Sequence, residues 1–369
     1  MNKKLLKNTE WTVLIVSLIL FSIGLIALFS ATQSTDYLEF KKQLQWFLVS
    51  IPFLILAMVI DYNVIVKFST LAYIIIIGLL IAVLFTAPID GATRWFKIGN
   101  FGTFQPSELA KIIVVLFSAF ILNKLQLKGR KEINKIWKLA IFLIIACIPP
   151  IALILQQPDI GTAIAFIVAL TLIIFVSGID KKYIIIAIIL LVLSGQFIYS
   201  HLPDHALRRI EVFLNPNTDP RGDGYNIIQS KLAVGAGQIF GMGLFKGNQT
   251  QLGFLHPKTT DFIFSVIGEE LGFIITGIIV ILYIILITKT IYIAKTAKDN
   301  IGSYIAIGIG GILFFHMAQN IGMTMGLLPI TGIPLPFVSY GGSSLITNFI
   351  CIGLLLNISA RRQKSIFIE

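Results

Sequence analysis

Residues 259–273 read TTDFIFSVIGEELGF, and the apolar run continues through residues 274–288 as IITGIIVILYIILIT. Roughly 20 mostly apolar residues can cross a bilayer as a helix, so this run predicts a membrane span over 262–288. It also carries Asp261 at its start and Glu269 and Glu270 further along. Ionised carboxylates at membrane depth are costly and are usually functional. The stretch therefore predicts both a membrane fold and a candidate site.

The whole chain has the composition of a membrane protein. Of its 369 residues, 56% are hydrophobic and 13% are charged, which is too little polar surface to cover a soluble protein of this length. We expect one integral membrane domain over residues 1–369, with the first apolar segment retained as a span and not cleaved as a signal. Cys147 and Cys351 lie in separate apolar runs and predict packing residues, not a disulfide or a metal site.

Apolar runs between charged or turn-rich breaks predict an all-α, polytopic fold. We expect about ten membrane helices, at residues 11–31, 44–61, 64–86, 106–123, 137–156, 159–178, 183–200, 262–288, 302–328 and 340–359.

The placement of Lys and Arg predicts the orientation in the membrane. With the N-terminus in the cytoplasm, the basic segments MNKK, NKLQLKGRKEINKIWK, GIDKK, KTIYIAKTAK and ARRQK all fall on the cytoplasmic side, as the positive-inside rule requires. An even number of spans returns the C-terminus to that side. The net charge of +11 is then explained by orientation, and we expect no nucleic-acid partner. The outer face receives a large extracytoplasmic loop at about 201–261, between the seventh and eighth spans.

The three carboxylates of the opening stretch predict different roles. Asp261 stands where a polar loop meets the span, so it is either a reactive group facing the outer side or an N-cap of the helix. Glu269 and Glu270 lie roughly 12 to 14 Å further along a helix axis, too deep to form a dyad with Asp261. For at least one of them we favour structural pairing with a buried cation or hydroxyl.

Other spans also carry charged groups near their outer ends. Glu108 and Lys111 are three residues apart on one helix face, and either neutralise each other or share Lys111 with an anionic substrate. Asp159 precedes a span after a tight turn, which favours a helix cap.

The outer loops hold more cations than orientation requires. Arg94 and Lys97 flank Trp95 and Phe96, as interfacial cations and aromatics often do. An alternative is that Arg94 binds a lipid diphosphate bidentately. Further cations on the outer side are Arg208, Arg209, Arg221, Lys231 and Lys246. This surplus indicates an anionic ligand on the outer face.

Two stretches predict irregular or closely packed backbone. The glycines of residues 235–241 match no nucleotide-binding spacing, so we interpret them as sites of close backbone packing. The segment GIPLPFVSYGGSSL, residues 332–345, combines Pro and Gly before the last span. Irregular backbone at membrane depth is tolerated where it lines a cavity, so we expect this segment to be a cavity wall. The four histidines form no ligand pattern, and no cofactor signature is present.

Five ordered motifs resemble one family. They are GATRWFKIGNFGTFQPSELAK, QPDIGTA, NPNTDPRGDGYNIIQSKLAVGAGQIFGMGL, TDFIFSVIGEELGF and NIGMTMGLLPITGIPLPFVSYGGSSL. In this order they resemble the SEDS (shape, elongation, division and sporulation) proteins, over essentially the whole chain. The stretch GNQTQLGFL is more similar to the RodA members than to the FtsW members.

The resemblance implies a bacterial cytoplasmic-membrane enzyme. Its expected activity is peptidoglycan glycosyl transfer, which polymerises lipid II into glycan strands at the outer face and releases undecaprenyl diphosphate. The expected role of these strands is in cell-wall elongation and cell shape. Expected partners are a class B penicillin-binding protein and other membrane proteins of the elongation complex. Two alternatives are kept: a lipid II flippase, and a membrane scaffold for the penicillin-binding protein. A divalent cation, Mg²⁺ or Mn²⁺, is left open as a cofactor.

The same resemblance assigns site residues. The family's essential aspartate falls on Asp261, and positions on which the family depends fall on Arg94, Glu108 and Lys111. We take as candidate substrate-binding residues Arg94, Lys97, Glu108, Lys111, Asp159, Arg208, Arg209, Gln229, Ser230, Lys246, Ser339 and Ser343. Before the aspartate the family usually has Glu and His where this chain has Pro257 and Thr259. A role for those two side chains is not carried over.

Overall fold

The computed structural model describes residues 3–88, 92–99, 102–200, 204–219 and 222–362. Helices occupy all ten predicted ranges. They are α2 (Thr12–Ala31), α3 (Leu38–Val59), α5 (Ser69–Val83), α6 (Pro106–Leu125), the run of α7 (Ile136–Phe142), η3 (Leu143–Cys147) and α8 (Ile148–Gln156), α9 (Ile160–Val176), α10 (Lys181–Ser200), α14 (Ile263–Thr296), α15 (Asn300–Thr324) and α16 (Gly342–Ala360).

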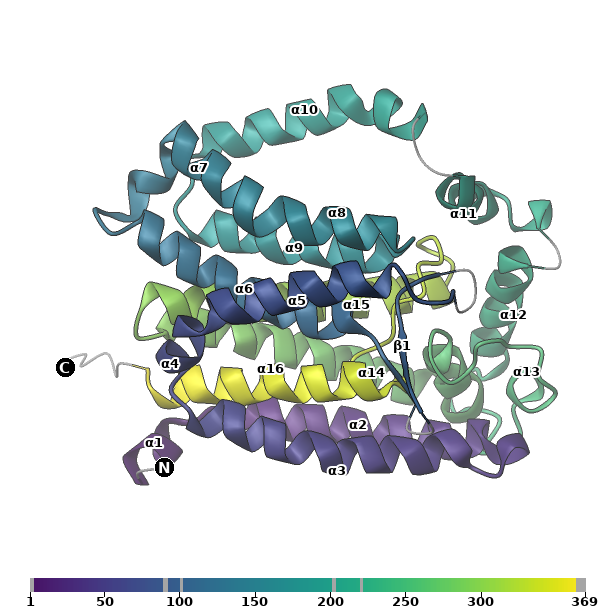
Figure 1. The fold of residues 1–369 in the computed structure, drawn as a ribbon. Helices are drawn as coiled ribbons and strands as arrows, with labels where there is room; N and C mark the ends of the chain where they lie inside the picture. The colour runs from purple at the N-terminus through teal and green to yellow at the C-terminus, as the bar shows by residue number, and fades with distance from the viewer. Residues whose placement is uncertain (1–2, 89–91, 100–101, 201–203, 220–221, 363–369) are drawn as a thin grey trace.

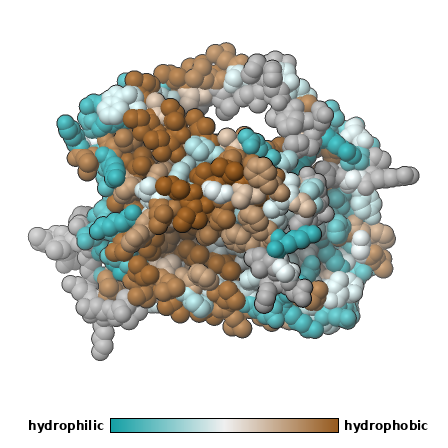
Figure 2. All heavy atoms as spheres, in the orientation of Figure 1, coloured by the Kyte–Doolittle hydropathy of each residue, from teal (hydrophilic) through white to brown (hydrophobic). Residues whose placement is uncertain are grey.

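The polytopic, all-α membrane fold is confirmed. Within the described residues, six helices are long and apolar enough to cross a membrane, and α5 and α9 are shorter apolar helices. Figure 2 shows hydrophobic residues covering the middle of the helices, with hydrophilic residues gathered toward the two ends. The number of ten spans, the orientation and the single domain stay predictions.

The helices lie side by side with α16 at the centre. Helix α16 packs against α3, α6, α2, α14 and α15, and its residues from Asn348 to Ala360 are almost all buried. The two chain ends lie at the same end of the bundle (Figure 1). In the same view α10 stands apart from α8 and α9.

Short elements fill both ends of the bundle. At the end that holds the chain termini are α1 (Lys3–Asn8), α4 (Tyr62–Lys67) and η2 (Arg130–Asn134). At the opposite end is an antiparallel hairpin of β1 (Phe96–Ile98) and β2 (Gly102–Phe104), in which Lys97 pairs with Thr103. The predicted loop of 201–261 contains α11 (Asp204–Leu214), η4 (Pro216–Thr218), α12 (Asp223–Ala236) and α13 (Asn248–Gln251), and η1 (Gln33–Thr35) joins α2 to α3.

Helix α14 is broken, which corrects the prediction of one continuous span. Gly272 has φ 78° and ψ −174°, a conformation open to glycine and not to a helix. The freed carbonyls of Glu269 and Glu270 accept hydrogen bonds from the amides of Met242 and Gly243, at 2.9 and 3.0 Å. A loop from a distant part of the sequence therefore completes the hydrogen bonding that the break removes.

Close backbone packing by glycines is confirmed at this break. A Cβ placed on Gly237 would lie 1.8 Å from the carbonyl oxygen of Gly268, and one on Gly241 would lie 2.2 Å from that of Glu270. Gly235 has nothing within 4 Å, so two of the three glycines carry the contact. Only residues without a side chain allow the two backbones to approach this closely.

The two buried glutamates of α14 differ in their hydrogen bonding, and the expectation was structural pairing for at least one of them. Glu269 accepts three hydrogen bonds, from the amides of Gln249 and Thr250 and from the Thr250 hydroxyl, at 2.7, 3.0 and 2.6 Å. Glu270 accepts one from the Gln251 side chain at 2.8 Å. Pairing with a buried hydroxyl is therefore confirmed for Glu269, which satisfies the first amides of α13.

Candidate functional site

Asp261 lies in the turn that precedes α14, at the end of the bundle opposite the chain termini. The helix begins at Ile263, its N-cap is Phe262, and it receives no side-chain cap hydrogen bond. The alternative interpretation of Asp261 as the cap of this helix is therefore wrong. Asp261 is half-buried as a residue, and its carboxylate does not cap the first amides of α14.

The surroundings of Asp261 combine burial with three charged neighbours. Burial raises the pKa of the Asp261 carboxyl above its ordinary value of 3.8. The Arg94 guanidinium, a hydrogen bond from Thr260 and the Arg209 guanidinium each oppose that rise in pKa, and the Asp159 carboxylate adds to it. The fold therefore brings together four predicted site residues from distant parts of the chain, with two cations around two carboxylates.

The predicted cavity wall packs directly beside Asp261. Gly332 has φ 69°, and a Cβ placed on it would lie 3.4 Å from Asp261 Oδ2. Asn320 of α15 donates from Nδ2 to the carbonyl oxygens of both Asp261 and Ile333, at 2.9 and 2.8 Å. The Ser339 hydroxyl donates to the carbonyl of Thr260 at 2.7 Å. Segment 330–341 is thus held against the turn that carries Asp261.

Asp159 caps α9, as predicted, and also meets Arg94. Its carboxylate accepts from the Thr162 amide at 3.1 Å, the Thr162 hydroxyl at 2.9 Å and Gln105 Nε2 at 3.3 Å. Arg94 Nη1 lies 3.6 Å from Asp159 Oδ2, and the guanidinium lies over the Trp95 ring, 4.2 Å from its centroid. Arg94 Nε is buried and has no hydrogen-bond partner among the described residues. This guanidinium therefore keeps donor capacity for an anion.

Glu108 and Lys111 form the ion pair that one interpretation predicted. Lys111 Nζ lies 2.8 Å from Glu108 Oε1, and the two side chains are 3% and 5% exposed, respectively. Lys111 Nζ also lies 2.9 Å from His316 Nε2. Sequence reasoning missed His316 because it fits no motif, although a histidine inside an apolar helix is itself a signal.

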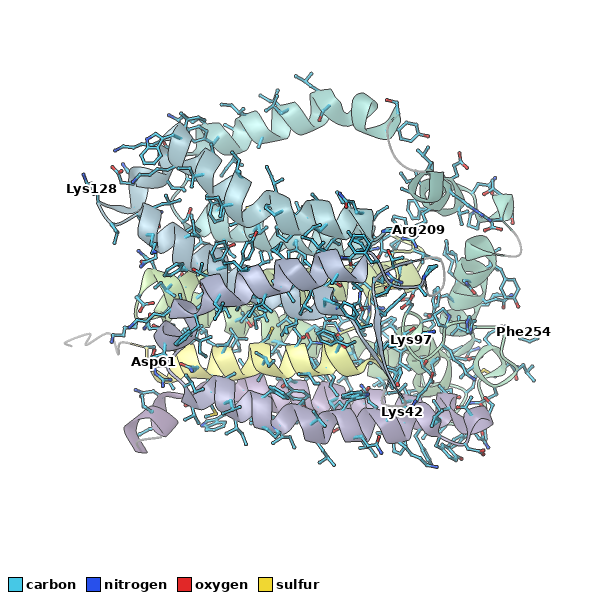
Figure 3. The ribbon with its side chains drawn as sticks, in the orientation of Figure 1. Lys42, Asp61, Lys97, Lys128, Arg209 and Phe254 are labelled. Carbon is cyan, nitrogen blue, oxygen red and sulfur yellow. The ribbon has the colours of Figure 1, made fainter. Side chains whose placement is uncertain are left out.

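The remaining candidates divide into groups that hold the fold and groups at the surface. Ser230 is buried and bonds with Ser265 and with the carbonyl of Thr324. Ser343 accepts from the Gln105 amide at 3.2 Å. Gln229 is half-buried, and Lys97 and Lys246 are exposed. Arg208 pairs with Asp219 at 2.9 Å and is 65% exposed. Figure 3 shows Lys97 and Arg209 at the end of the bundle opposite Asp61 and Lys128. Arg221 lies outside the described residues. Substrate binding by these residues stays a prediction.

The described residues contain no group of three or more His, Cys, Asp or Glu side chains that could hold a metal ion. Asp159 already accepts from three donors, so of these two carboxylates Asp261 is the more available to a cation. Mg²⁺ is often bound by one or two carboxylates together with substrate phosphates. The site fits such shared binding and supplies no cage of its own.

Known proteins similar to this chain cover almost all of it. Peptidoglycan glycosyltransferase MrdB of Escherichia coli K12 is 36% identical over 366 residues, 97% of each chain. Stage V sporulation protein E of Bacillus subtilis is 35% identical over 362 residues, 95% of this chain and 97% of its own. A probable peptidoglycan glycosyltransferase FtsW of a Geobacter species is 35% identical over 364 residues, 96% of this chain and 97% of its own. Because identities to the different groups are so similar, the closer resemblance to RodA stays a prediction.

Solved structures match the fold. A chain from a peptidoglycan synthase complex, described as coordinating polymerization and crosslinking, superposes with a TM-score of 0.81 at 25% identity, covering 95% of this chain and 97% of that one. The crystal structure of the rod shape determining protein RodA of Thermus thermophilus gives 0.71 at 25% identity, covering 96% and 98%. The family model described as cell cycle protein, for FtsW, RodA and SpoVE, matches residues 10–364. With the motifs, the helix order and the relatives in agreement over this length, the chain belongs to the FtsW, RodA and SpoVE family of cell cycle proteins, the SEDS family.

Proposed function

We propose that this protein is a peptidoglycan glycosyltransferase that polymerises lipid II at the outer face of the bacterial cytoplasmic membrane, for cell-wall elongation and cell shape. The observation that carries the proposal is the position of Asp261, a half-buried carboxylate of raised pKa at one end of the bundle, near the guanidinium groups of Arg94 and Arg209. Relatives that match this chain over almost its whole length carry the name peptidoglycan glycosyltransferase.

Asp261 is the proposed general base. The 4-hydroxyl of the acceptor sugar attacks the anomeric carbon of the donor, and its proton passes to the Asp261 carboxylate. A new C–O bond forms as the bond from the anomeric carbon to the diphosphate oxygen breaks. A single displacement of this kind inverts the anomeric carbon and needs no second carboxylate as nucleophile. A pKa raised by burial makes Asp261 a stronger base than an exposed aspartate.

Arg94 and Arg209 are the proposed diphosphate ligands. The leaving undecaprenyl diphosphate gains charge as the bond breaks, and fixed guanidinium groups stabilise that charge. The unpartnered Nε of Arg94 supports this role. A divalent cation bound by the diphosphate and Asp261 would add further charge stabilisation.

Glu108 and Lys111 fit a supporting role better than direct substrate binding. Lys111 directs donors to Glu108 and to His316 while almost fully buried. Ser339 likewise directs its hydroxyl to the backbone of Thr260. We propose that these groups hold the site together and that the substrate meets Asp261, Arg94 and Arg209.

The proposed partner is a class B penicillin-binding protein, which would crosslink the new strands. A structural neighbour of this chain comes from a complex that coordinates polymerization with crosslinking. Other membrane proteins of the elongation machinery are further proposed partners.

Reconstituted polymerisation tests the proposal. The purified protein, placed in liposomes with lipid II and with its penicillin-binding protein, should form glycan polymer, and Asp261→Asn should abolish it. Asp180→Asn is the matched control. Asp159 precedes α9 and Asp180 follows it, so Asp180 lies beyond the opposite end of that helix from the site. Polymer made normally by Asp261→Asn would refute the base assignment. Lipid II translocation without polymer would favour the flippase, and partner binding with neither activity would favour the scaffold.

A further inference from the structure

A buried row of polar groups links α6 and α15 to the segment before α16. Lys111 Nζ lies 2.8 Å from Glu108 Oε1 and 2.9 Å from His316 Nε2. On its other side the His316 ring places Nδ1 3.1 Å from the carbonyl oxygen of Pro334. Glu108, Lys111 and His316 are 4%, 3% and 2% exposed, so water does not substitute for these contacts.

The partners of His316 determine where its proton lies. A lysine ammonium has donors and no acceptor, so Nε2 facing Lys111 must offer its lone pair. A carbonyl oxygen only accepts, so Nδ1 facing Pro334 must carry the hydrogen. His316 is therefore a neutral imidazole with both nitrogens engaged, which excludes it as a general base.

The same face of α15 holds two consecutive carbonyls of the segment. His316 and Asn320 are four residues apart and so lie on one helix face. His316 hydrogen-bonds to the carbonyl oxygen of Pro334. Asn320 donates to the carbonyl oxygens of Ile333 and Asp261. The next residue back, Gly332, is the one whose Cβ would lie 3.4 Å from Asp261 Oδ2.

This segment needs such help because its own hydrogen bonding is incomplete. Pro334 and Pro336 have no backbone N–H, and the residues from Pro329 to Leu335 form no regular element. Side chains bond its carbonyls instead. Gln319 donates to the carbonyl of Pro329 and Tyr283 to that of Pro336. Between these two, Asn320 bonds the carbonyl of Ile333 and His316 that of Pro334. Of these, His316 is the one that also contacts the Glu108–Lys111 pair.

We propose that His316 is a positioning residue for the transfer reaction: its Nδ1–H fixes the carbonyl of Pro334 and thereby the wall against which the Asp261 carboxylate is aligned. The inference rests on the proposed function, since it assigns to His316 the alignment of the proposed base. His316 touches neither substrate nor reacting atoms. Its contribution is to the rate of the chemical step and not to substrate affinity.

Two amide substitutions separate the two contacts of the ring. His316→Asn places an amide N–H near the position of Nδ1 and offers no acceptor to Lys111. His316→Gln extends its amide to the position of Nε2, where its oxygen can accept from Lys111, and leaves Pro334 without a donor. Phe314→Leu, at a side chain of α15 that is 48% exposed, is the control for substitution in this helix.

The expected result is a split between these variants in lipid II polymerisation. His316→Gln should lower kcat on the order of tenfold or more, because small misplacements of a catalytic group cost this much, with KM unchanged. His316→Asn and Phe314→Leu should stay close to wild type. Folded His316→Gln with wild-type kcat, or an equal loss in His316→Asn, would overturn the proposal. If neither amide variant folds, the role is structural only and the proposal is also overturned. A wild-type protein that makes no polymer would instead refute the proposed function.

Discussion

Asn320 Nδ2 donates to the carbonyl oxygen of Asp261 at 2.9 Å, and the same amide donates to Ile333 at 2.8 Å. One side chain of α15 therefore joins the turn that carries the proposed base to the proline-rich segment beside it. Asn320 is fully buried, so both carbonyls depend on it for their hydrogen bonds.

Substitution of Asn320 by Leu should lower both stability and activity. It leaves two buried carbonyls without a donor, at a cost of about 1–3 kcal/mol each. Thermal unfolding in nanodiscs and lipid II polymerisation measure the two effects. Asn348→Leu is the control, because Asn348 is similarly buried in α16 but makes a single 3.3 Å bond with Ser344. Equal losses in the two variants would contradict the role given to Asn320.

The pH dependence of polymerisation should reflect the raised pKa of Asp261. A general base must be deprotonated, so kcat/KM should fall as the pH drops through a pKa that lies above the ordinary 3.8. The measurement is the pH–rate profile of wild type against Arg94→Gln. Since the Arg94 guanidinium lowers the pKa of Asp261, its removal should move the acid limb to higher pH. An acid limb that stays in place would contradict the proximity of the two groups.

The ionised Asp261 carboxylate that activity requires should lower the stability of the fold. A carboxyl whose folded pKa is raised stabilises the fold at low pH, and this contribution is lost as the pH rises through the folded pKa. Asp261→Asn should therefore unfold at a higher temperature than wild type at neutral pH. The difference should shrink as the pH falls through the folded pKa. A variant less stable than wild type at neutral pH would show that the ionised carboxylate is stabilised in place.

Two of the glycines in residues 235–241, which pack near the break in α14, can be compared by substitution with alanine. Gly237→Ala would put a Cβ 1.8 Å from the carbonyl oxygen of Gly268, whereas the Cβ of Gly235→Ala meets nothing within 4 Å. Neither position needs a glycine conformation, since Gly237 has φ −71° and Gly235 lies within α12. We expect Gly237→Ala to lower the unfolding temperature sharply and Gly235→Ala to leave it unchanged. Equal behaviour would contradict the close packing of this loop on α14.

The sequence predicted those features that local patterns determine. Apolar runs located the ten helices because each span must be apolar over its own length. The cap at Asp159 followed from its position between a tight turn and a span, and the Glu108–Lys111 pair followed from a spacing of three residues, which a helix brings together. The clustering of charge around Asp261 was predicted only through the family resemblance, since spacing alone left its role open.

Features that depend on distant segments could not be predicted in this way. The residues around Gly272 have a helical pattern, and the break forms because the amides of Met242 and Gly243 replace the lost helical bonds. His316 lies 205 residues from Lys111 in sequence, so no local pattern pairs them. Both are tertiary contacts that override a local preference.

The neighbouring arginines of α11 give the most direct test of the proposed diphosphate site. Arg208 points to Asp219 and is 65% exposed, and exposed ion pairs contribute about 0–1 kcal/mol. Arg209 is half-buried and acts on the pKa of Asp261. Arg209→Gln should therefore reduce kcat/KM for lipid II on the order of tenfold, as expected for losing a charge-assisted hydrogen bond of about 1.5–3 kcal/mol. Arg208→Gln, which makes the same change of side chain one residue away, should stay near wild type. If Arg208→Gln were the more damaging variant, the donor diphosphate would lie on the Asp219 side of α11, away from Asp261.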